Sequence, residues 1–198
     1  MTAPERISVR ERLLDAAQDV IGGTGWSDVT MAGIAGVAGV SRQTVYNEFG
    51  TKHGLAEQLA HRELRRFLEV VRVRMASETT LVQGIRSACE GVLLLGEESP
   101  LVRTIAGSSG PGEDHDFLQL LTTESGEIAR AAVTVVHEAV AELYPPTALT
   151  GAELGVAVET VVRLVLSALT RPSKPPSEAA SDIAWIVGLV LDGAAARP

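Results

Sequence analysis

The chain has 198 residues, 45% of them hydrophobic and 21% charged, which excludes a disordered chain and fits one large or two small globular domains. No apolar stretch approaches the roughly 18 residues of a transmembrane helix, the charged N-terminus excludes a secretory signal, and a single cysteine excludes an internal disulfide, so we expect a cytoplasmic protein without a membrane partner. The net charge of −8 argues against a nucleic-acid partner for the molecule as a whole, but residues 1–75 carry ten basic against nine acidic residues and residues 76–198 seven against sixteen, so any attraction for phosphate belongs to the first third.

Residues 8–75 carry apolar side chains at helical spacing, interrupted by glycines and hydroxyl residues. Ser8-x-x-Glu11 has the form of a capping box at the start of a first helix, and Gly22-Gly23 is predicted to end that helix. Helices are expected over 8–21, 31–38, 42–49 and 51–75, with Ser8, Thr30, Ser41 and Thr51 as their N-caps.

Beyond residue 76 the sequence predicts five further helices. Proline-rich breaks at 145–146 and 171–177 and a glycine-rich loop at 107–116 separate them. Thr150-x-x-Glu153 is a second capping-box candidate. No strand pattern is found, so we predict an all-α fold of about nine helices, the last five near 79–96, 100–106, 116–143, 151–169 and 177–193.

Two short helices joined by a tight turn at Gly39 predict a helix-turn-helix at residues 30–49. At 100° per residue, Val45 and Phe49 of its second helix point inward, and polar side chains point outward. Arginine can bond guanine bidentately, glutamine and asparagine can bond adenine, and hydroxyls and helix N-termini favour phosphate. The pattern therefore predicts a surface for double-stranded DNA. One alternative is a helical hairpin that merely packs, and another is that Tyr46 alone is a core aromatic. The outward set consists of Ser41, Arg42, Gln43, Thr44, Tyr46 and Asn47.

The run TMAGIAGVAGVSRQTVYNEFGTKHGL, residues 30–55, resembles the DNA-binding segment of the TetR family of bacterial transcriptional regulators. The family pattern is close to T-x-x-x-I-A-x-x-A-G-V-S-x-x-T-x-Y-x-x-F-x-x-K-x-x-L, and the resemblance extends over residues 8–68. The matching residues are Thr30, Ile34, Ala35, Ala38, Gly39, Val40, Ser41, Thr44, Tyr46, Phe49, Lys52 and Leu55.

The resemblance implies roles for individual residues. Thr30, Tyr46 and Lys52 would contact phosphate, and Arg42, Gln43 and Asn47 would read bases. The chain departs from the family on the outer face of the second helix and three residues after Thr51, where relatives often carry charged or polar residues. The departures are Gly33, Gly36 and Gly54.

The same resemblance implies a DNA-binding head at 1–50, a connecting helix at 51–75 and an effector-binding and dimerisation domain at 76–198. The segments 156–170 and 183–193 are apolar almost all round, so each must cover two surfaces. We therefore expect a homodimer whose recognition helices, roughly 34–36 Å apart, read a near-palindromic operator. Its interface residues would be Val161, Leu164, Leu166, Ile183, Trp185, Ile186 and Leu189.

The middle helices would by resemblance enclose an effector pocket. Its candidate lining is aliphatic apart from Phe117, which favours a small hydrophobic effector with an alkyl or acyl chain, such as a fatty acid. Arg103, Arg130 or Arg163 could meet a carboxylate head. The candidate lining is Leu81, Ile85, Ala88, Val92, Leu101, Ile105, Phe117, Leu120, Leu121, Ile128 and Val136.

No catalytic motif, cofactor motif or metal-ligand spacing is found, so we do not expect an enzyme. We expect His115, between two aspartates, to lie in a solvated loop and Cys89 to be a buried small hydrophobic residue. The arginines at 62, 65 and 66 are expected on a solvated helix face, or alternatively in a longer DNA footprint. We predict a ligand-responsive DNA-binding regulator, and expect a repressor. The alternatives are a helical carrier or enzyme with a vestigial head, and a transcriptional activator.

Overall fold

The computed structural model describes residues 8–107 and 114–197, with the side chains of these residues except at 105, 107, 114–125 and 127. All regular secondary structure within these ranges is helical, which confirms the predicted all-α fold. None of the helices described is long and apolar enough to cross a bilayer.

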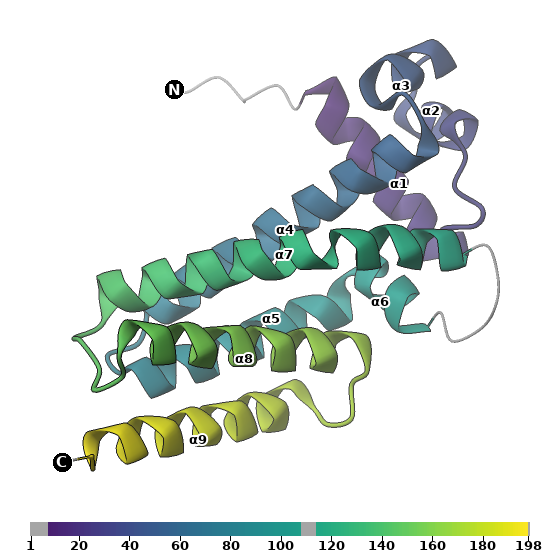
Figure 1. Cartoon of the computed structure of the whole chain (residues 1–198). Coiled ribbons are helices and arrows are strands. Elements are labelled where there is room, and N and C mark those ends of the chain that lie inside the picture. Colours follow the sequence, from purple (N-terminus) through teal and green to yellow (C-terminus); the bar gives the residue numbers. More distant parts are fainter. Residues whose placement is uncertain (1–7, 108–113, 198) are drawn as a thin grey trace, which may run out of the picture.

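The first three helices gather at one end of the molecule (Figure 1). They are α1 (Val9–Thr24), α2 (Met31–Ala38) and α3 (Arg42–Phe49), and α4 (Lys52–Ala76) runs from them into the rest of the chain. The predicted stop of α1 was wrong, because residues 22 and 23 remain helical. Gly25 ends the helix instead, with a φ of 88° and its N–H donating to the carbonyl of residue 21.

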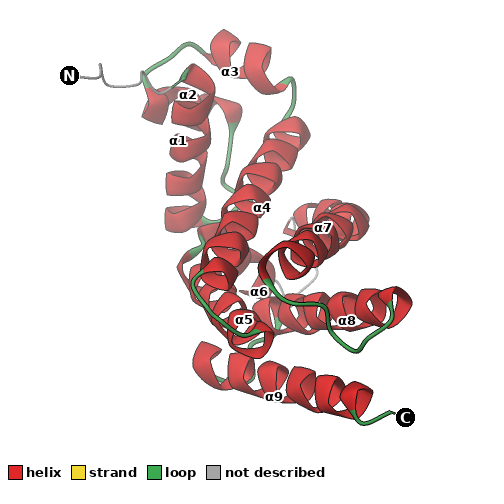
Figure 2. Ribbon diagram, turned by 90° about the vertical axis from the view of Figure 1, so that its left-hand side faces the viewer, coloured by secondary structure: helices red, strands yellow, loops and turns green. Residues whose placement is uncertain are grey.

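The remaining helices form the body: α5 (Leu81–Glu98), α6 (Pro100–Gly107), α7 (Asp114–Leu143), α8 (Gly151–Thr170) and α9 (Pro176–Ala195). Helix α4 packs on α5 and α7, α7 packs on α8, and α9 lies along α5 (Figure 2). Helix α7 begins two residues before its predicted start. Positions 108–113 of the predicted glycine-rich loop lie outside the described residues.

The two predicted capping boxes differ. At α8 both bonds are present: the Glu153 amide donates to the Thr150 hydroxyl over 3.3 Å, and the Thr150 amide donates to the Glu153 carboxylate over 2.9 Å. At α1 the Glu11 amide donates to the Ser8 hydroxyl over 3.1 Å. The Glu11 carboxylate turns to Arg62 of α4 instead of back to Ser8, so only half of that box is formed.

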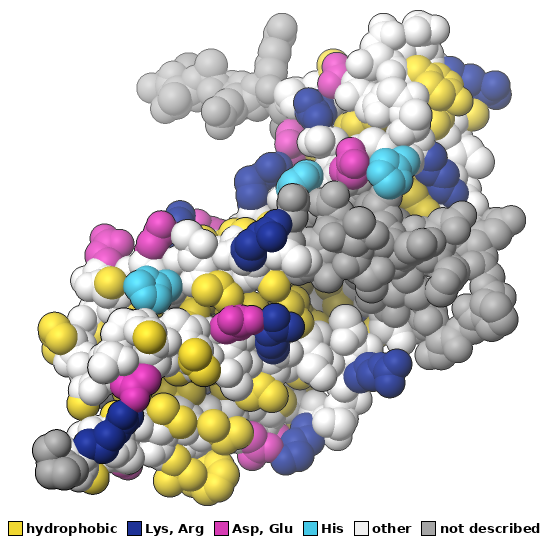
Figure 3. Space-filling view, in the orientation of Figure 1, with side chains coloured by type: hydrophobic (Ala, Val, Ile, Leu, Met, Phe, Trp, Pro, Cys, Tyr) yellow, Lys and Arg dark blue, Asp and Glu magenta, His cyan; other side chains and the backbone are white. Residues whose placement is uncertain are grey.

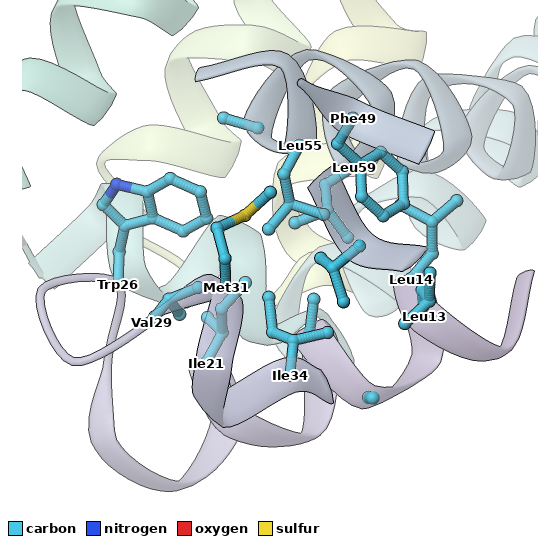
Figure 4. Close-up of a cluster of buried hydrophobic side chains, with 14 of the residues drawn as sticks. Leu13, Leu14, Ile21, Trp26, Val29, Met31, Ile34, Phe49, Leu55 and Leu59 are labelled. Carbon is cyan, nitrogen blue, oxygen red and sulfur yellow. The ribbon is translucent and has the colours of Figure 1, made fainter. Parts of the chain in front are cut away.

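Two clusters of buried side chains stabilise the molecule. The first joins α1, α2, α3 and the start of α4, with Leu13, Ile34, Val45, Leu55 and Leu59 fully buried (Figure 4). The second lies between α4, α5, α7, α8 and α9. Helix α4 contributes to both, and Leu101 of α6 packs into the first, so α4 and α6 are the elements through which a change in one cluster can reach the other.

Candidate functional site

The turn between α2 and α3 is fixed by backbone conformation. Gly39 has a φ of 66°, in the left-handed region that favours glycine. Its N–H donates to the carbonyls of residues 35 and 36, and the Val40 N–H donates to that of residue 35 over 3.0 Å, which closes α2. Ser41 then begins α3 by accepting from the Thr44 amide over 3.1 Å. The helix-turn-helix predicted at residues 30–49 is present.

The turn between α3 and α4 is tighter still. Gly50, with a φ of 69°, donates its N–H to the Tyr46 carbonyl over 2.8 Å, and the Thr51 hydroxyl caps α4 by accepting from the Gly54 amide over 3.0 Å. A Cβ at position 54 would collide with the Phe49 carbonyl oxygen. The departure from the family pattern at Gly54 therefore has a steric cause.

The outer face of α3 is polar and exposed. Val45 and Phe49 point into the head, whereas Arg42, Gln43 and Asn47 are exposed, as is the Tyr46 side chain at 49%. Tyr46 is therefore no core aromatic. The Gln43 amide donates to the Asn47 amide oxygen over 2.8 Å, so these two side chains hold each other on the face where base edges would lie. The Ser41 and Thr44 hydroxyls lie 2.9 Å apart.

Two predicted phosphate ligands are engaged within the protein. The Lys52 ammonium donates to the carbonyls of Trp26 and Ser27 over 2.9 and 3.2 Å and lies 4.9 Å from the centre of the Trp26 ring. It thus anchors the α1–α2 loop to the start of α4 and keeps one of its three donors for another partner. The exposed Thr30 hydroxyl caps α2, accepting from the Gly33 amide over 2.9 Å.

A group of buried charges joins α1 to α4. Arg62 is 9% exposed, and its guanidinium donates to the carboxylates of Asp15 and Glu11 over 2.7 and 3.3 Å. Glu63 is 3% exposed and accepts from Gln18 of α1 over 3.2 Å and from Arg66 over 3.1 Å. The expectation that Arg62 belongs to a solvated face was wrong, because the residue lies between two helices. Arg65 and Arg66 are exposed.

A cavity of about 420 Å³ lies in the body, between α4, α5, α6, α7 and α8. That volume falls within the range of small-molecule sites, which run from about 300 to 1,000 Å³. Its described lining is almost entirely apolar. Six of the predicted pocket residues line it: Ile85, Ala88, Val92, Leu101, Ile128 and Val136.

The other predicted lining residues are not among those that line the cavity in the described part of the structure. Leu81 lines a separate groove beside α8 and α9. The side chains of Ile105, Phe117, Leu120 and Leu121 lie outside the described residues. The sequence analysis did not predict that α4 and α8 each form a wall of the cavity. The apolar positions of α4 recur at helical spacing, and this is the signal that could have identified its wall. The missed residues include Leu64, Phe67, Leu68 and Val71 of α4 and Val165 and Leu169 of α8.

The polar groups of the cavity are not those expected. Arg103, Arg130 and Arg163 are exposed and do not line it, and Arg163 pairs with Glu159 over 2.6 Å. Within the described lining the acidic side chain is Glu63, at the end nearest the head. Cys89 lines the cavity as a buried thiol whose pKa burial raises to about 12, which keeps it protonated and apolar in character.

Large apolar side chains are exposed along α8 and α9 (Figure 3). A groove of about 450 Å³ runs between the two helices and includes several of these residues. Of the predicted interface residues, Leu164, Trp185, Ile186 and Leu189 are exposed, whereas Val161 and Leu166 are half-buried against the body core. Ile183 is 5% exposed, lies in the chain's own core and also lines this groove. We define the apolar face as Val156, Leu164, Trp185, Ile186, Leu189 and Val190.

Metal ligation finds no support among the residues whose side chains are described, because no three His, Cys, Asp or Glu residues there converge. His115 and its two aspartate neighbours belong to α7, but their side chains lie outside that description.

Two family models match the sequence. One, described as bacterial regulatory proteins of the tetR family, matches residues 13–59. The other, described as the C-terminal domain of the bacterial tetracyclin repressor, matches residues 81–188. The first match covers the helix-turn-helix and its supporting helices, and the second spans most of the body.

The chain is 31% identical over 188 residues to the HTH-type transcriptional regulator AlkX of Mycobacterium tuberculosis, covering 92% of this chain and 84% of that protein. The crystal structure of the TetR family repressor AlkX from Dietzia sp., implicated in biodegradation of n-alkanes, superposes with a TM-score of 0.73 at 26% identity, over 96% of this chain and 99% of that one. The SmeT–triclosan complex shares the fold, with a TM-score of 0.60 at 20% identity and 90% of each chain covered.

Proposed function

Because the chain belongs to the TetR family of bacterial transcriptional regulators, which bind DNA in response to small ligands, we propose that it is a homodimeric repressor released from its operator by an alkyl-chain effector. One observation carries this proposal. Helix α4 begins directly after the exposed polar recognition helix α3 and, further along, lines the aliphatic cavity. Residues 1–50 would be the head, 51–75 the connecting helix and 76–198 the effector and dimer domain.

DNA reading is assigned to the outer face of α3. Arg42, Gln43 and Asn47 are exposed together there and would contact base edges. Tyr46, Thr30 and the hydroxyls of Ser41 and Thr44 would contact phosphate, and so would the remaining donor of Lys52. Since the body is acidic, it would face away from the duplex.

The apolar face is assigned to a second copy of the chain. Exposed apolar patches of this kind mark interaction sites, and a head with one recognition helix needs a partner to read two half-sites. Four helices, α8 and α9 from each copy, would bury the face. Trp185, exposed at 66%, is its largest side chain, so Trp185→Arg should give a monomer by sedimentation velocity, whereas Arg171→Ala, at an exposed position outside the face, should not.

The effector is assigned to the 420 Å³ cavity. Its aliphatic lining offers contact to a flexible chain, in keeping with the relative implicated in n-alkane biodegradation. The connection to the head runs through α4, which lines the cavity and is tied to α1 by the Arg62–Asp15 and Gln18–Glu63 contacts. A ligand that shifts α4 would move the head and change the spacing of the two recognition helices. Linkage of this kind is typically worth about 1–3 kcal/mol.

The first experiment is fluorescence anisotropy of the full-length protein with DNA from upstream of its own gene, at several salt concentrations. We expect tight, saturable binding that competes well against random DNA and weakens steeply with salt. Binding no tighter than to random DNA, repeated with fragments selected from genomic DNA, would contradict sequence-specific regulation. A promoter reporter then distinguishes a repressor from an activator. The position of the operator relative to the promoter decides whether the bound protein lowers or raises transcription.

Two variants separate base contacts from phosphate contacts. Gln43→Ala should relax base preference at one operator position, costing about 1–3 kcal/mol on the preferred sequence only. Tyr46→Phe should weaken binding to all sequences alike. If Gln43→Ala weakened specific and random DNA equally, its role in base reading would be rejected.

A further inference from the structure

One residue of the cavity wall carries a buried polar atom that has no hydrogen-bond partner among the described residues. Glu63 is 3% exposed, and its Oε2 accepts from Gln18 and Arg66, but its Oε1 is buried without a hydrogen-bond partner among the described residues. Glu63 also lines the cavity, whose other walls are almost wholly aliphatic. A buried carboxylate oxygen without a donor is costly, so this position calls for a hydrogen-bond donor.

We propose that Glu63 Oε1 accepts a hydrogen bond from the effector, and that the effector is a long-chain primary alcohol. This inference rests on the proposed function, since it names the head group of the ligand that the cavity would hold. The hydroxyl would lie at the end of the cavity nearest the head, and the alkyl chain would run between α5, α7 and α8.

The number of donors separates an alcohol from an amine. A hydroxyl has one donor, which matches the single unpaired oxygen, whereas an alkylammonium has three. The described lining offers no second carboxylate. Of its two hydroxyl residues, Thr170 already donates its proton to carbonyls of its own helix, and Ser167 is exposed to solvent. An ammonium would therefore leave donors unsatisfied in an apolar site.

Charge separates an alcohol from a fatty acid. A carboxylate head at the same place would face the Glu63 carboxylate, and the described lining contains no arginine, lysine or histidine to offset the repulsion. Arg66, which pairs with Glu63 Oε2, is exposed and does not line the cavity. An unmodified alkane fits the walls but leaves Oε1 without a donor.

The test compares three probes with the same chain: dodecanol, dodecane and dodecanoate. Binding to the full-length protein is measured by equilibrium dialysis with mass spectrometry. The cavity-filling variant Val165→Trp, at a half-buried residue of the cavity wall, reports whether the probe occupies this site, because a probe bound there should lose its binding. We expect dodecanol to bind about tenfold or more tightly than either of the others, as one hydrogen bond to a charged acceptor requires, and to lose this binding in Val165→Trp.

Two variants sharpen the result. Glu63→Gln keeps an oxygen for Gln18 and presents an amide N–H to the cavity, so dodecanoate should gain about tenfold relative to dodecanol. Glu69→Gln makes the same change at an exposed position of α4 outside the cavity lining and should leave the preference unchanged.

The outcomes distinguish the alcohol inference from the proposed function on which it rests. If dodecane or dodecanoate bound the native protein as tightly as dodecanol, lost this binding in Val165→Trp and released DNA, the alcohol inference would be overturned and the alkyl-responsive regulator would stand. An unchanged preference in Glu63→Gln would likewise overturn it. If none of the three bound at a site that Val165→Trp blocks, the alkyl effector of the proposed function would be overturned as well, while DNA binding would still be judged by anisotropy.

Discussion

The head and the body are both helical, yet they are packed in opposite ways. In the head, Leu13, Ile34, Leu55 and Leu59 are 0% exposed around a continuous core, and its glycines close tight turns. The body keeps an internal cavity of about 420 Å³ and exposes large apolar side chains on α8 and α9. A reader of DNA needs a fixed recognition helix, whereas a sensor needs room for a ligand and a surface for a partner. The difference in packing thus follows the difference in task.

The largest effect should come from truncating one leucine in each region. Leu59→Ala removes side-chain volume from the filled head core, so the free energy of unfolding should fall by about 2–5 kcal/mol. Leu68→Ala, at a half-buried residue of α4 that lines the cavity, enlarges a space that already exists and should cost less than half as much. Urea denaturation measures both, and equal losses would mean that the head is no better packed than the body.

A second pair of variants tests where the head itself is tight. In Gly54→Ala the new Cβ meets the Phe49 carbonyl oxygen, so the α3–α4 turn must shift and we expect a loss of about 1–3 kcal/mol of stability. Gly36→Ala meets nothing within 4 Å on the exposed face of α2 and should stabilise the protein by up to about 1 kcal/mol. Thermal unfolding of both distinguishes them, and a stabilised Gly54→Ala would refute the steric explanation of this glycine.

The junction between the regions should be more sensitive to charge than the surface of the body. Asp15→Asn weakens the 2.7 Å contact to the buried Arg62, which already has two buried nitrogens without partners among the described residues, so we expect a loss of about 1–2 kcal/mol. Glu159→Gln breaks an exposed pair on α8 and should cost under about 0.5 kcal/mol. Similar small losses in the two variants would show that the junction contributes no more than a surface pair.

The smallest effect concerns the capping box of α8. The Arg197 guanidinium and the Thr150 backbone and hydroxyl donate to Glu153 and lower the pKa of its carboxyl from 4.5 to about 2. Because the folded state lowers this pKa, its contribution to stability should be present in full above pH 4.5 and disappear as the pH falls toward 2. Melting temperatures of the native protein and Glu153→Gln should therefore converge over that interval. Glu142→Gln, at an exposed residue of α7, is the control, and a constant difference between the native protein and Glu153→Gln would contradict the assignment.

The helices and their caps were predictable because they depend on local sequence. The bounds of α2 and α3 match their predicted ranges, and the Thr150–Glu153 box is present, since a hydroxyl and a carboxylate three residues apart find each other within one turn. The end of α1 was not predictable in this way. Gly22 and Gly23 tolerate helix, and the chain stops only at Gly25, where a positive φ is adopted.

The all-helical fold, the helix-turn-helix and the outward polar face of α3 follow from the amino-acid sequence, because helical periodicity fixes which side chains share a face. Which neighbour each apolar face meets depends on how the helices pack. This packing turned Ile183 into the core and left Trp185 outside, and it brought Val165 of α8 to the wall of the cavity. It also buried Arg62 and Glu63 between helices, although two adjacent charged residues in a sequence usually indicate an exposed surface. Periodicity defines one helix at a time, whereas a pocket, an interface or a buried charge is defined by contacts between helices far apart in the chain.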